Sequence, residues 1–180
     1  MTPTADLRTI AFDRVFLLSE DEAHAPSAKT LEPLSPAARE SVVRMALRRL
    51  AFQVLFELDM GGRDRAWAAD ALSRVEGLGP IDAERVAALA TGAWEARADA
   101  DAEFLALAPD WPSHRLAATD RAILRLAHFE MVSRTTAPKV VVSEAVELAR
   151  HFSTEKSPAF INGLLDRVLH RIEQVTDGAT

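Results

Sequence analysis

Residues 138–152 have the sequence PKVVVSEAVELARHF, and this stretch decides between a helical and a β-containing fold. Three consecutive valines at 140–142 have the β-branched side chains that favour strands. Helical spacing outweighs this propensity, because apolar residues recur every three or four positions, at Val142, Ala145, Leu148, Ala149 and Phe152. A strand also needs a partner strand, and the chain offers none. We therefore predict a helix that begins at Pro138.

The same helical spacing extends in both directions from this segment. Ser35 and Pro36 form a helix start, a capping side chain followed by a proline whose missing N–H costs nothing there. Ser157 and Pro158 repeat this signal. We predict further helices over 36–60, 64–76, 82–107 and 120–134, the last with Thr119 as a cap. The chain is thus predicted to be all-α, with six or seven helices and no sheet.

The composition is typical of a water-soluble domain. With 180 residues, 48% of them hydrophobic, the chain can bury one core or two small ones. It has no cysteine, which excludes disulfides and suits a reducing cytosol. The apolar stretch from Ile10 to Leu18 is interrupted by Asp13 and Arg14, so it does not resemble a signal peptide. No later stretch approaches the roughly 20 apolar residues of a membrane helix. We expect a cytoplasmic protein with no membrane segment.

The first 34 residues differ from the rest of the chain. Residues 19–34 are acidic and punctuated by Pro26 and Pro33, a composition typical of linkers. We expect residues 1–34 to be a mobile acidic extension and residues 176–180 to be a short C-terminal tail. Within the extension, the apolar stretch is compatible with a short helix that docks on the body and with a weak strand.

The net charge of −6 conceals two basic segments. Residues 35–60 carry 4 bases and 3 acids, and residues 113–139 carry 5 bases and 2 acids. In every other part of the chain the acids outnumber the bases. Because neutralising phosphates requires locally clustered Lys and Arg, these two segments are the candidate anion-binding patches.

Motifs of catalysis are absent from the sequence. No phosphate-binding glycine loop, nucleophile elbow or H-E-x-x-H motif occurs. The 5 histidines include no pair at helical i, i+4 spacing, and surface or packing roles explain them better than metal ligation. Carboxylate pairs such as Asp99 with Asp101 and Glu144 with Glu147 fit solvated helix faces. We expect no catalytic residues, no cofactor and no metal site.

Two stretches carry a more specific signal than their periodicity. Residues 44–58, RMALRRLAFQVLFEL, resemble the opening helix of NusB proteins, which is rich in arginine and continues as A-x-Q-x-L followed by an aromatic residue. Residues 111–166 resemble the same family more strongly. The matching pieces, in order and at the family's spacing, are WPSHRLAATDRAILRLAHFEM, APKVVVSEAVELARHFSTEKS and FINGLLD. The resemblance covers about residues 36–172.

The resemblance to the NusB family implies a fold and a function. It implies one domain over 35–175, built from two small helical bundles over about 36–108 and about 112–175. It also implies a non-enzymatic factor in transcription antitermination. Such a factor binds boxA-type single-stranded RNA together with NusE, a small-subunit ribosomal protein. The pair holds this RNA near RNA polymerase in the antitermination complex and supports ribosomal RNA transcription.

Five arginines match the family's basic positions. Arg44, Arg48 and Arg49 fall on its basic first helix, where guanidinium groups hold RNA phosphates. Arg121 and Arg125 match its D-R-x-x-L-R motif, which lies near that helix in the family. The resemblance therefore implies that both sets lie on one side of the molecule and form one RNA track. Without it, a solvated helix face is the simpler interpretation of such arginine pairs.

Three further residues are candidate RNA contacts. Phe160, in the FING motif, suits stacking on an unpaired base, although packing in the core competes with this role. Asn162 is a candidate hydrogen-bonding residue in the same motif. Lys156 occupies a loop position where the family often has an acidic residue, and its positive charge favours RNA binding. Gly163 costs roughly 1 kcal/mol within a helix relative to Ala, so we interpret it as allowing close approach of a backbone.

The resemblance also points to a protein-binding surface. Phe56 and Met60 at the end of the first helix, together with Asp120, are the candidate contacts with NusE. Aromatic anchors with a charged rim suit a modest heterodimer interface. The alternative for Phe56 is a place in the core.

The sequence departs from the family's pattern near its start. Met45 and Ala46 stand where family members often have more arginine, and the acidic extension precedes them. The extension is a candidate intramolecular mimic of RNA, unless the true start of translation lies further downstream. Two other functions remain open beside antitermination. One is an RNA-recognition domain that acts with an RNA methyltransferase, and the other is a structural helical bundle that homodimerises when free.

Overall fold

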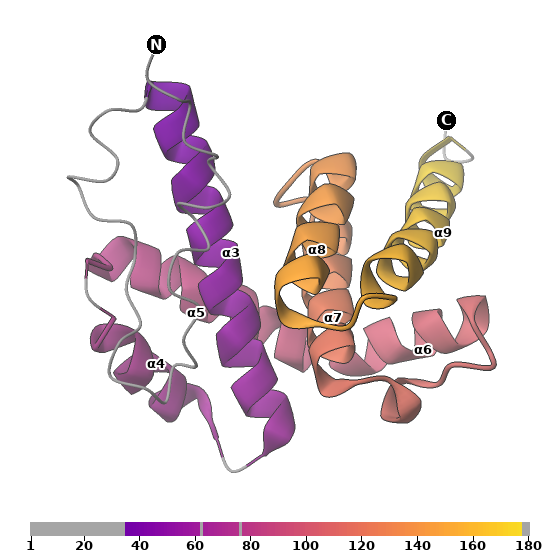
Figure 1. Cartoon of the computed structure of the whole chain (residues 1–180), viewed down its shortest axis with the longest axis horizontal. Coiled ribbons are helices and arrows are strands. Elements are labelled where there is room, and N and C mark those ends of the chain that lie inside the picture. The colour runs from indigo at the N-terminus through magenta and orange to yellow at the C-terminus, as the bar shows by residue number, and fades with distance from the viewer. Residues whose placement is uncertain (1–34, 62, 76, 178–180) are drawn as a thin grey trace.

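The computed structural model describes residues 35–61, 63–75 and 77–177, and these residues form an all-helical body without strands (Figure 1). The predicted fold class is therefore confirmed. The helices are α3 (Pro36–Met60), α4 (Arg65–Ser73), α5 (Pro80–Glu95), α6 (Arg97–Leu107), α7 (Ala118–Val132), α8 (Pro138–Phe152) and α9 (Ser157–Asp177), with a short 3₁₀ turn, η1 (Ser113–Arg115). The predictions for residues 1–34 lie outside the described ranges. Helix α9 continues to Asp177, two residues into the predicted tail.

Local signals explain where the first helices begin and end. The hydroxyl of Ser35 accepts a hydrogen bond from the backbone N–H of Ala38 at 3.3 Å, which caps α3 as predicted. Helix α3 ends at Met60 and is followed by Gly61, whose φ of 86° lies in the region that favours glycine. The carboxylate of Asp64 caps α4 by accepting from the N–H of Trp67 at 2.8 Å.

The helices pack in two groups (Figure 1). Helices α3, α4 and α5 lie in one half, and α7, α8 and α9 lie in the other. Helix α7 is central, since it contacts α3, α5, α6, α8 and α9. One continuous hydrophobic core runs through both halves, and its largest fully buried side chains include those of Leu50, Leu55, Leu72, Phe104, Ile123, Leu124, Met131, Ile161 and Leu165.

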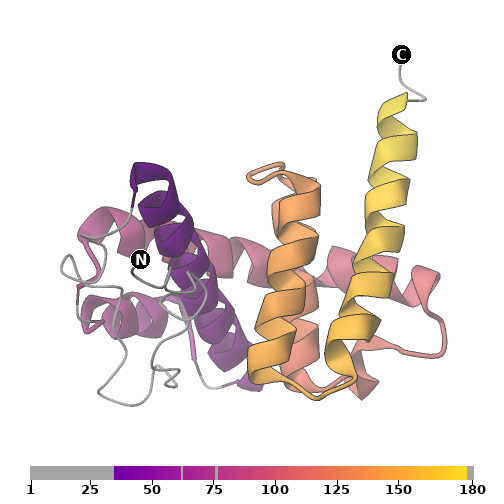
Figure 2. The same cartoon turned by 45° about the horizontal axis from the view of Figure 1, so that its top comes forward.

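The predicted long helix over 82–107 consists of two helices. Figure 2 shows α6 following α5 end to end. The break lies at Ala96, whose N–H bonds to the carbonyls of Gly92 and Trp94. The guanidinium of Arg97 also donates to the Trp94 carbonyl at 2.6 Å, directly beside the break. Helix α6 contacts α7 and α9 as well as α5, so it joins the two halves.

The start of α7 also differs from the prediction. Helix α7 begins at Ala118 with Ala117 in the capping position, so Thr119 lies inside the first turn and does not cap it.

Helix α8 begins at Pro138 as predicted, and its valine run is helical throughout. Spacing therefore outweighed β propensity in this segment, because α8 buries its apolar side against α7 and α9.

A glycine sets the distance between α5 and α7. A Cβ atom added at Gly92 would lie 2.4 Å from the Cζ of Phe129. The Phe129 ring therefore occupies the space that any larger residue at position 92 would need. This close approach fixes α5 against the second half of α7.

Within the described ranges, no helix combines the length and the apolar character needed to cross a membrane.

Candidate nucleic-acid interface

Two ion-pair clusters join α3 to α7. At one end, Arg48 on α3 donates from Nε and Nη2 to the two carboxylate oxygens of Glu130 on α7, at 2.8 and 2.7 Å. Its Nη1 lies 3.5 Å from the carboxylate of Glu144 on α8. Burial by itself lowers the pKa of Arg48, but the hydrogen bond to Glu130 and the charges of Glu130 and Glu144 outweigh it and raise the pKa above its ordinary value. Arg48 is therefore a charged interior residue that ties three helices together.

The second cluster lies at the other end of the same pair of helices. Arg125 donates to Asp59, the penultimate residue of α3, at 2.6 Å. It also donates from Nε and Nη2 to the two carboxylate oxygens of Asp101 on α6, at 2.9 and 2.7 Å. Burial lowers the pKa of Arg125, yet the hydrogen bonds and charges of the two aspartates raise it overall. Arg121 donates to the second oxygen of Asp59 at 2.7 Å. This cluster joins α3, α6 and α7.

The structure brings the two predicted arginine sets to one seam, but it buries most of them. Arg48 of the first set and the Arg121 and Arg125 pair both lie along the contact between α3 and α7, and their clusters are about 16 Å apart along α3, from Arg48 to Asp59. Arg48, Arg49 and Arg125 are only 7%, 2% and 6% exposed. Their guanidinium groups are interior groups, which corrects the expectation of an arginine track on the surface. Contact between RNA and Arg48 or Arg125 would require the ion pairs to open.

Arg44 is the exposed member of the predicted set. Its side chain is 57% exposed and pairs with Glu40, one helical turn earlier, at 2.6 Å. An exposed pair of this kind contributes between about 0 and 1 kcal/mol, so a phosphate can replace Glu40 at little cost. Of the three arginines on α3 that were predicted to bind RNA, Arg44 is therefore the one whose guanidinium group a phosphate can reach.

A pocket with aromatic and cationic walls lies where α7 and α9 begin. This aromatic pocket has a volume of about 280 Å³, and its walls include Trp111, Arg115, Lys156 and Phe160. The centroids of the Trp111 and Phe160 rings lie 6.0 Å apart, and the rings are tilted by 54°. Trp111 is 53% exposed, and both cationic side chains are exposed. Stacking surfaces beside cations are the chemistry that binds unpaired nucleotides.

Phe160 combines the two roles that the sequence left open. The residue is half-buried and packs against the core, while its ring also borders the aromatic pocket. Trp111 and Arg115 also line this pocket, although the sequence pattern did not predict them as site residues. Trp111 stands in a short corner between Pro109 and Pro112, and a tryptophan in such a loop is the signal that could have identified it.

Asp120 lines the aromatic pocket and is itself buried. The residue is 8% exposed, and its carboxylate accepts hydrogen bonds from Ser153 at 2.6 Å and from Ser157 at 2.9 Å. These bonds tie the start of α7 to the turn between α8 and α9. The predicted contact of Asp120 with a partner protein stays a prediction; in the structure its buried carboxylate positions the loop that carries Lys156.

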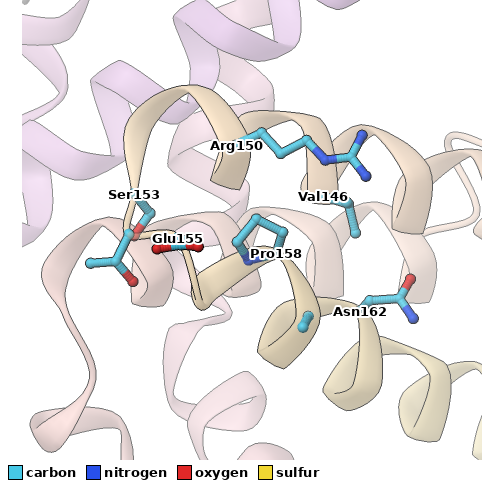
Figure 3. Close-up of a pocket in the computed structure, with 8 residues that line it drawn as sticks. Val146, Arg150, Ser153, Glu155, Pro158 and Asn162 are labelled. Atoms are coloured by element: carbon cyan, nitrogen blue, oxygen red, sulfur yellow. The ribbon is translucent and has the colours of Figure 1, made fainter.

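Asn162 and Gly163 lie on the exposed side of α9. The amide of Asn162 donates to Asp166 at 2.9 Å. A Cβ at Gly163 would meet no atom within 4 Å, so no helix of the described body approaches it. Asn162 lines a second pocket of about 580 Å³, drawn in Figure 3, to which α8 contributes Val146 and Arg150 and α9 contributes Pro158. Open space at Gly163 is compatible with approach of an external backbone.

The two apolar partner-binding candidates have different surroundings. Phe56 is half-buried and packs against the core, with its ring centroid 6.4 Å from that of Phe52. Met60, the last residue of α3, is 60% exposed. Met60 is therefore the candidate that the surface offers most fully to another protein.

Comparison with known proteins identifies the family. The family model described as "NusB family" matches residues 45–170. The transcription antitermination protein NusB of Symbiobacterium thermophilum is 42% identical over 135 residues, which cover 70% of this chain and 88% of that protein. NusB of Herpetosiphon aurantiacus is 36% identical over 135 residues, covering 73% of this chain and 92% of that protein.

The fold leads to the same family. A solved structure of NusB from T. maritima superposes with a TM-score of 0.62 at 27% sequence identity, and the match covers 69% of this chain and 89% of that one. The matched region includes both ion-pair clusters and the aromatic pocket, since all of their residues lie between 45 and 170. The chain belongs to the NusB family.

Proposed function

We propose that this protein is a non-catalytic transcription antitermination factor of the cytoplasm that binds boxA-type single-stranded RNA together with NusE. The curated relatives named above are transcription antitermination proteins. The observation that carries the RNA-binding part is the aromatic pocket. There Trp111 and Phe160 offer stacking surfaces with Arg115 and Lys156 beside them. In this role the protein joins the RNA polymerase antitermination complex and supports ribosomal RNA transcription.

The aromatic pocket suits sequence-specific contact with an unpaired base. A base that stacks on the Trp111 ring leaves its edge open to hydrogen bonding, as in other readers of single-stranded RNA. Lys156 and Arg115 would hold the flanking phosphates, and Asn162 and Gly163 border the same end of α9. Arg44 lies toward the far end of the α3/α7 seam, so an RNA segment of several nucleotides would connect the two regions.

The buried arginines contribute indirectly in this proposal. Arg48 and Arg125 hold α3 against α7, and this packing sets the distance between Arg44 and the aromatic pocket. Arg121 is partly exposed beside Asp59 and can reach an external phosphate only by exchanging one carboxylate contact. For NusE we propose a contact centred on Met60, the exposed apolar residue at the end of α3.

Binding of boxA-type RNA to wild type and to Trp111→Ala and Phe160→Ala, with and without NusE, tests the proposal. Stacking contributes about 1–3 kcal/mol per base, so each variant should lower the affinity by about 5- to 150-fold. The matched control is Val132→Ala, which removes an exposed apolar side chain from the far end of α7. Equal affinities of all variants would refute an RNA site at the aromatic pocket. Failure of wild type to bind even with NusE would refute the proposed function.

A further inference from the structure

A large apolar groove runs between the first half of α3, the start of α5 and the end of α7. Its volume is about 980 Å³. Its apolar wall consists of Val43, Leu47, Val86, Leu89 and Phe129, all but Val86 half-buried. We call it the α3/α5 groove. The Phe129 ring, which lines the groove, also packs closely against Gly92 of α5.

Cationic side chains surround this apolar wall. Arg39, Arg44 and Arg85 line the groove and are exposed, against the single exposed acid Glu40. Arg44 pairs with Glu40 and Arg85 with Asp82 at the surface, and exposed pairs of this kind exchange partners at little cost. The remaining charged lining residues, Arg48 and Glu130, neutralise each other in the interior. The groove therefore suits a segment that is apolar and acidic.

One segment of this chain has that composition. Seven of the nine residues from Ile10 to Leu18 are apolar, and Ser19 is followed directly by Glu20, Asp21 and Glu22. Residues 1–34 as a whole carry 6 acids and 3 bases. An apolar run followed by an acidic cluster matches an apolar wall with an arginine rim in chemistry.

Chain length allows this segment to reach the groove. Residues 23–34 separate the acidic cluster from the start of the described body, and 12 residues span at most about 40 Å. The groove itself begins at Pro36 and extends along α3 to Arg48, a distance of about 18 Å. A tether of this length keeps the segment at a roughly millimolar effective concentration, which favours it over a second copy at ordinary protein concentrations.

We propose that residues 10–22 of the same chain occupy the α3/α5 groove, with Ile10–Leu18 against its apolar wall and Glu20, Asp21 and Glu22 against Arg39, Arg44 and Arg85. Burial of the apolar wall supplies the binding free energy, and the acidic cluster sets the direction. The docked segment covers Arg44. If the proposed RNA-binding function also holds, the segment competes with RNA phosphates for that guanidinium group.

The absence of cysteine permits a direct test in the full chain. A nitroxide spin label on Ser19→Cys should broaden the NMR signals of the Val43, Leu47, Val86 and Leu89 methyl groups. It should spare the signal of Leu105, which is exposed on α6. Broadening that is uniform over the surface would overturn the proposal. Broadening seen only when spin-labelled and isotope-labelled chains are mixed would assign the groove to a second copy and overturn it too.

Charge exchange tests the rim without removing the segment. The reversal E20K/D21K/E22K should abolish the groove broadening, and adding R39E/R44E/R85E should restore it. The control replaces that second set with R65E/R74E, exposed arginines at the start of α4 and directly after it that lie outside the groove lining, and should restore nothing. Restoration by the control pair, or no loss in the first variant, would overturn the pairing. A Phe12→Ser/Phe16→Ser chain that keeps full broadening would overturn the apolar contact.

Discussion

Arg48 of α3 and Glu130 of α7 lie 82 positions apart in the sequence and are joined by two hydrogen bonds of 2.8 and 2.7 Å. Both side chains are almost fully buried, at 8% and 3% exposure. Thr136 donates to the same carboxylate at 3.2 Å, and Glu144 lies near the arginine. An interior ion pair of this kind specifies one arrangement of the helices, since neither partner tolerates losing the other.

The first prediction concerns this ion pair. Arg48→Ala should destabilise the fold by about 3–5 kcal/mol, because it leaves the carboxylate of Glu130 buried without its guanidinium partner. Denaturant unfolding followed by circular dichroism measures the change. The control Arg44→Ala removes an exposed arginine one turn away and should stay within about 0.5 kcal/mol of wild type. A loss in Arg48→Ala no larger than in the control would contradict the structural role.

Sequence patterns predicted the helices well because helix signals are local. The spacing in 138–152, the cap at Ser35 and the proline at 138 each act within a few residues. The break at Ala96 escaped prediction because Ala, Arg and Glu are all good helix formers and nothing in the local sequence marks a stop. Its cause is tertiary, since α6 turns to pack on α7 and α9.

The candidate site was predicted less well, for a physical reason. Arginines count as surface residues in a sequence pattern, yet Arg48 and Arg125 are buried because distant carboxylates neutralise them. Asp59 lies 66 positions from Arg125, so no local pattern links the two. The aromatic pocket also depends on a contact between residues far apart in the sequence, Trp111 in a loop and Phe160 on α9. That RNA binds there stays a prediction.

The second prediction uses two glycines as a matched pair. Gly92→Ala should destabilise the fold by about 1–3 kcal/mol, because its Cβ would overlap the Phe129 ring, which outweighs the helix propensity gained. Gly163→Ala meets no atom and should stabilise the fold by roughly 0.5–1 kcal/mol. Thermal unfolding of both variants gives the comparison. Equal shifts in the same direction would show that propensity alone governs both positions.

The third prediction concerns Asp120. Asp120→Ala removes the acceptor for two serine hydroxyls and should destabilise the fold by about 1–3 kcal/mol while loosening the turn that carries Lys156. RNA affinity should therefore fall although Asp120 is itself buried. Asp166→Ala, which removes an exposed acceptor on α9, is the control for stability. An Asp120→Ala protein that unfolds earlier but binds RNA with unchanged affinity would separate this turn from the RNA site.

The fourth prediction concerns salt. If Arg115 and Lys156 neutralise one phosphate each, the double variant Arg115→Ala/Lys156→Ala should reduce the slope of log affinity against log salt by about 1.4, at about 0.7 per contact for single strands. Titrations at several salt concentrations measure the slope. The control Arg65→Ala/Arg74→Ala removes two exposed arginines, at the start of α4 and directly after it, and should leave the slope unchanged. Losing a stacking surface lowers the affinity equally at every salt concentration. Trp111→Ala should therefore lower log affinity throughout without changing its slope against log salt. A tilt in Trp111→Ala, or none in the cation variant, would contradict this division of roles.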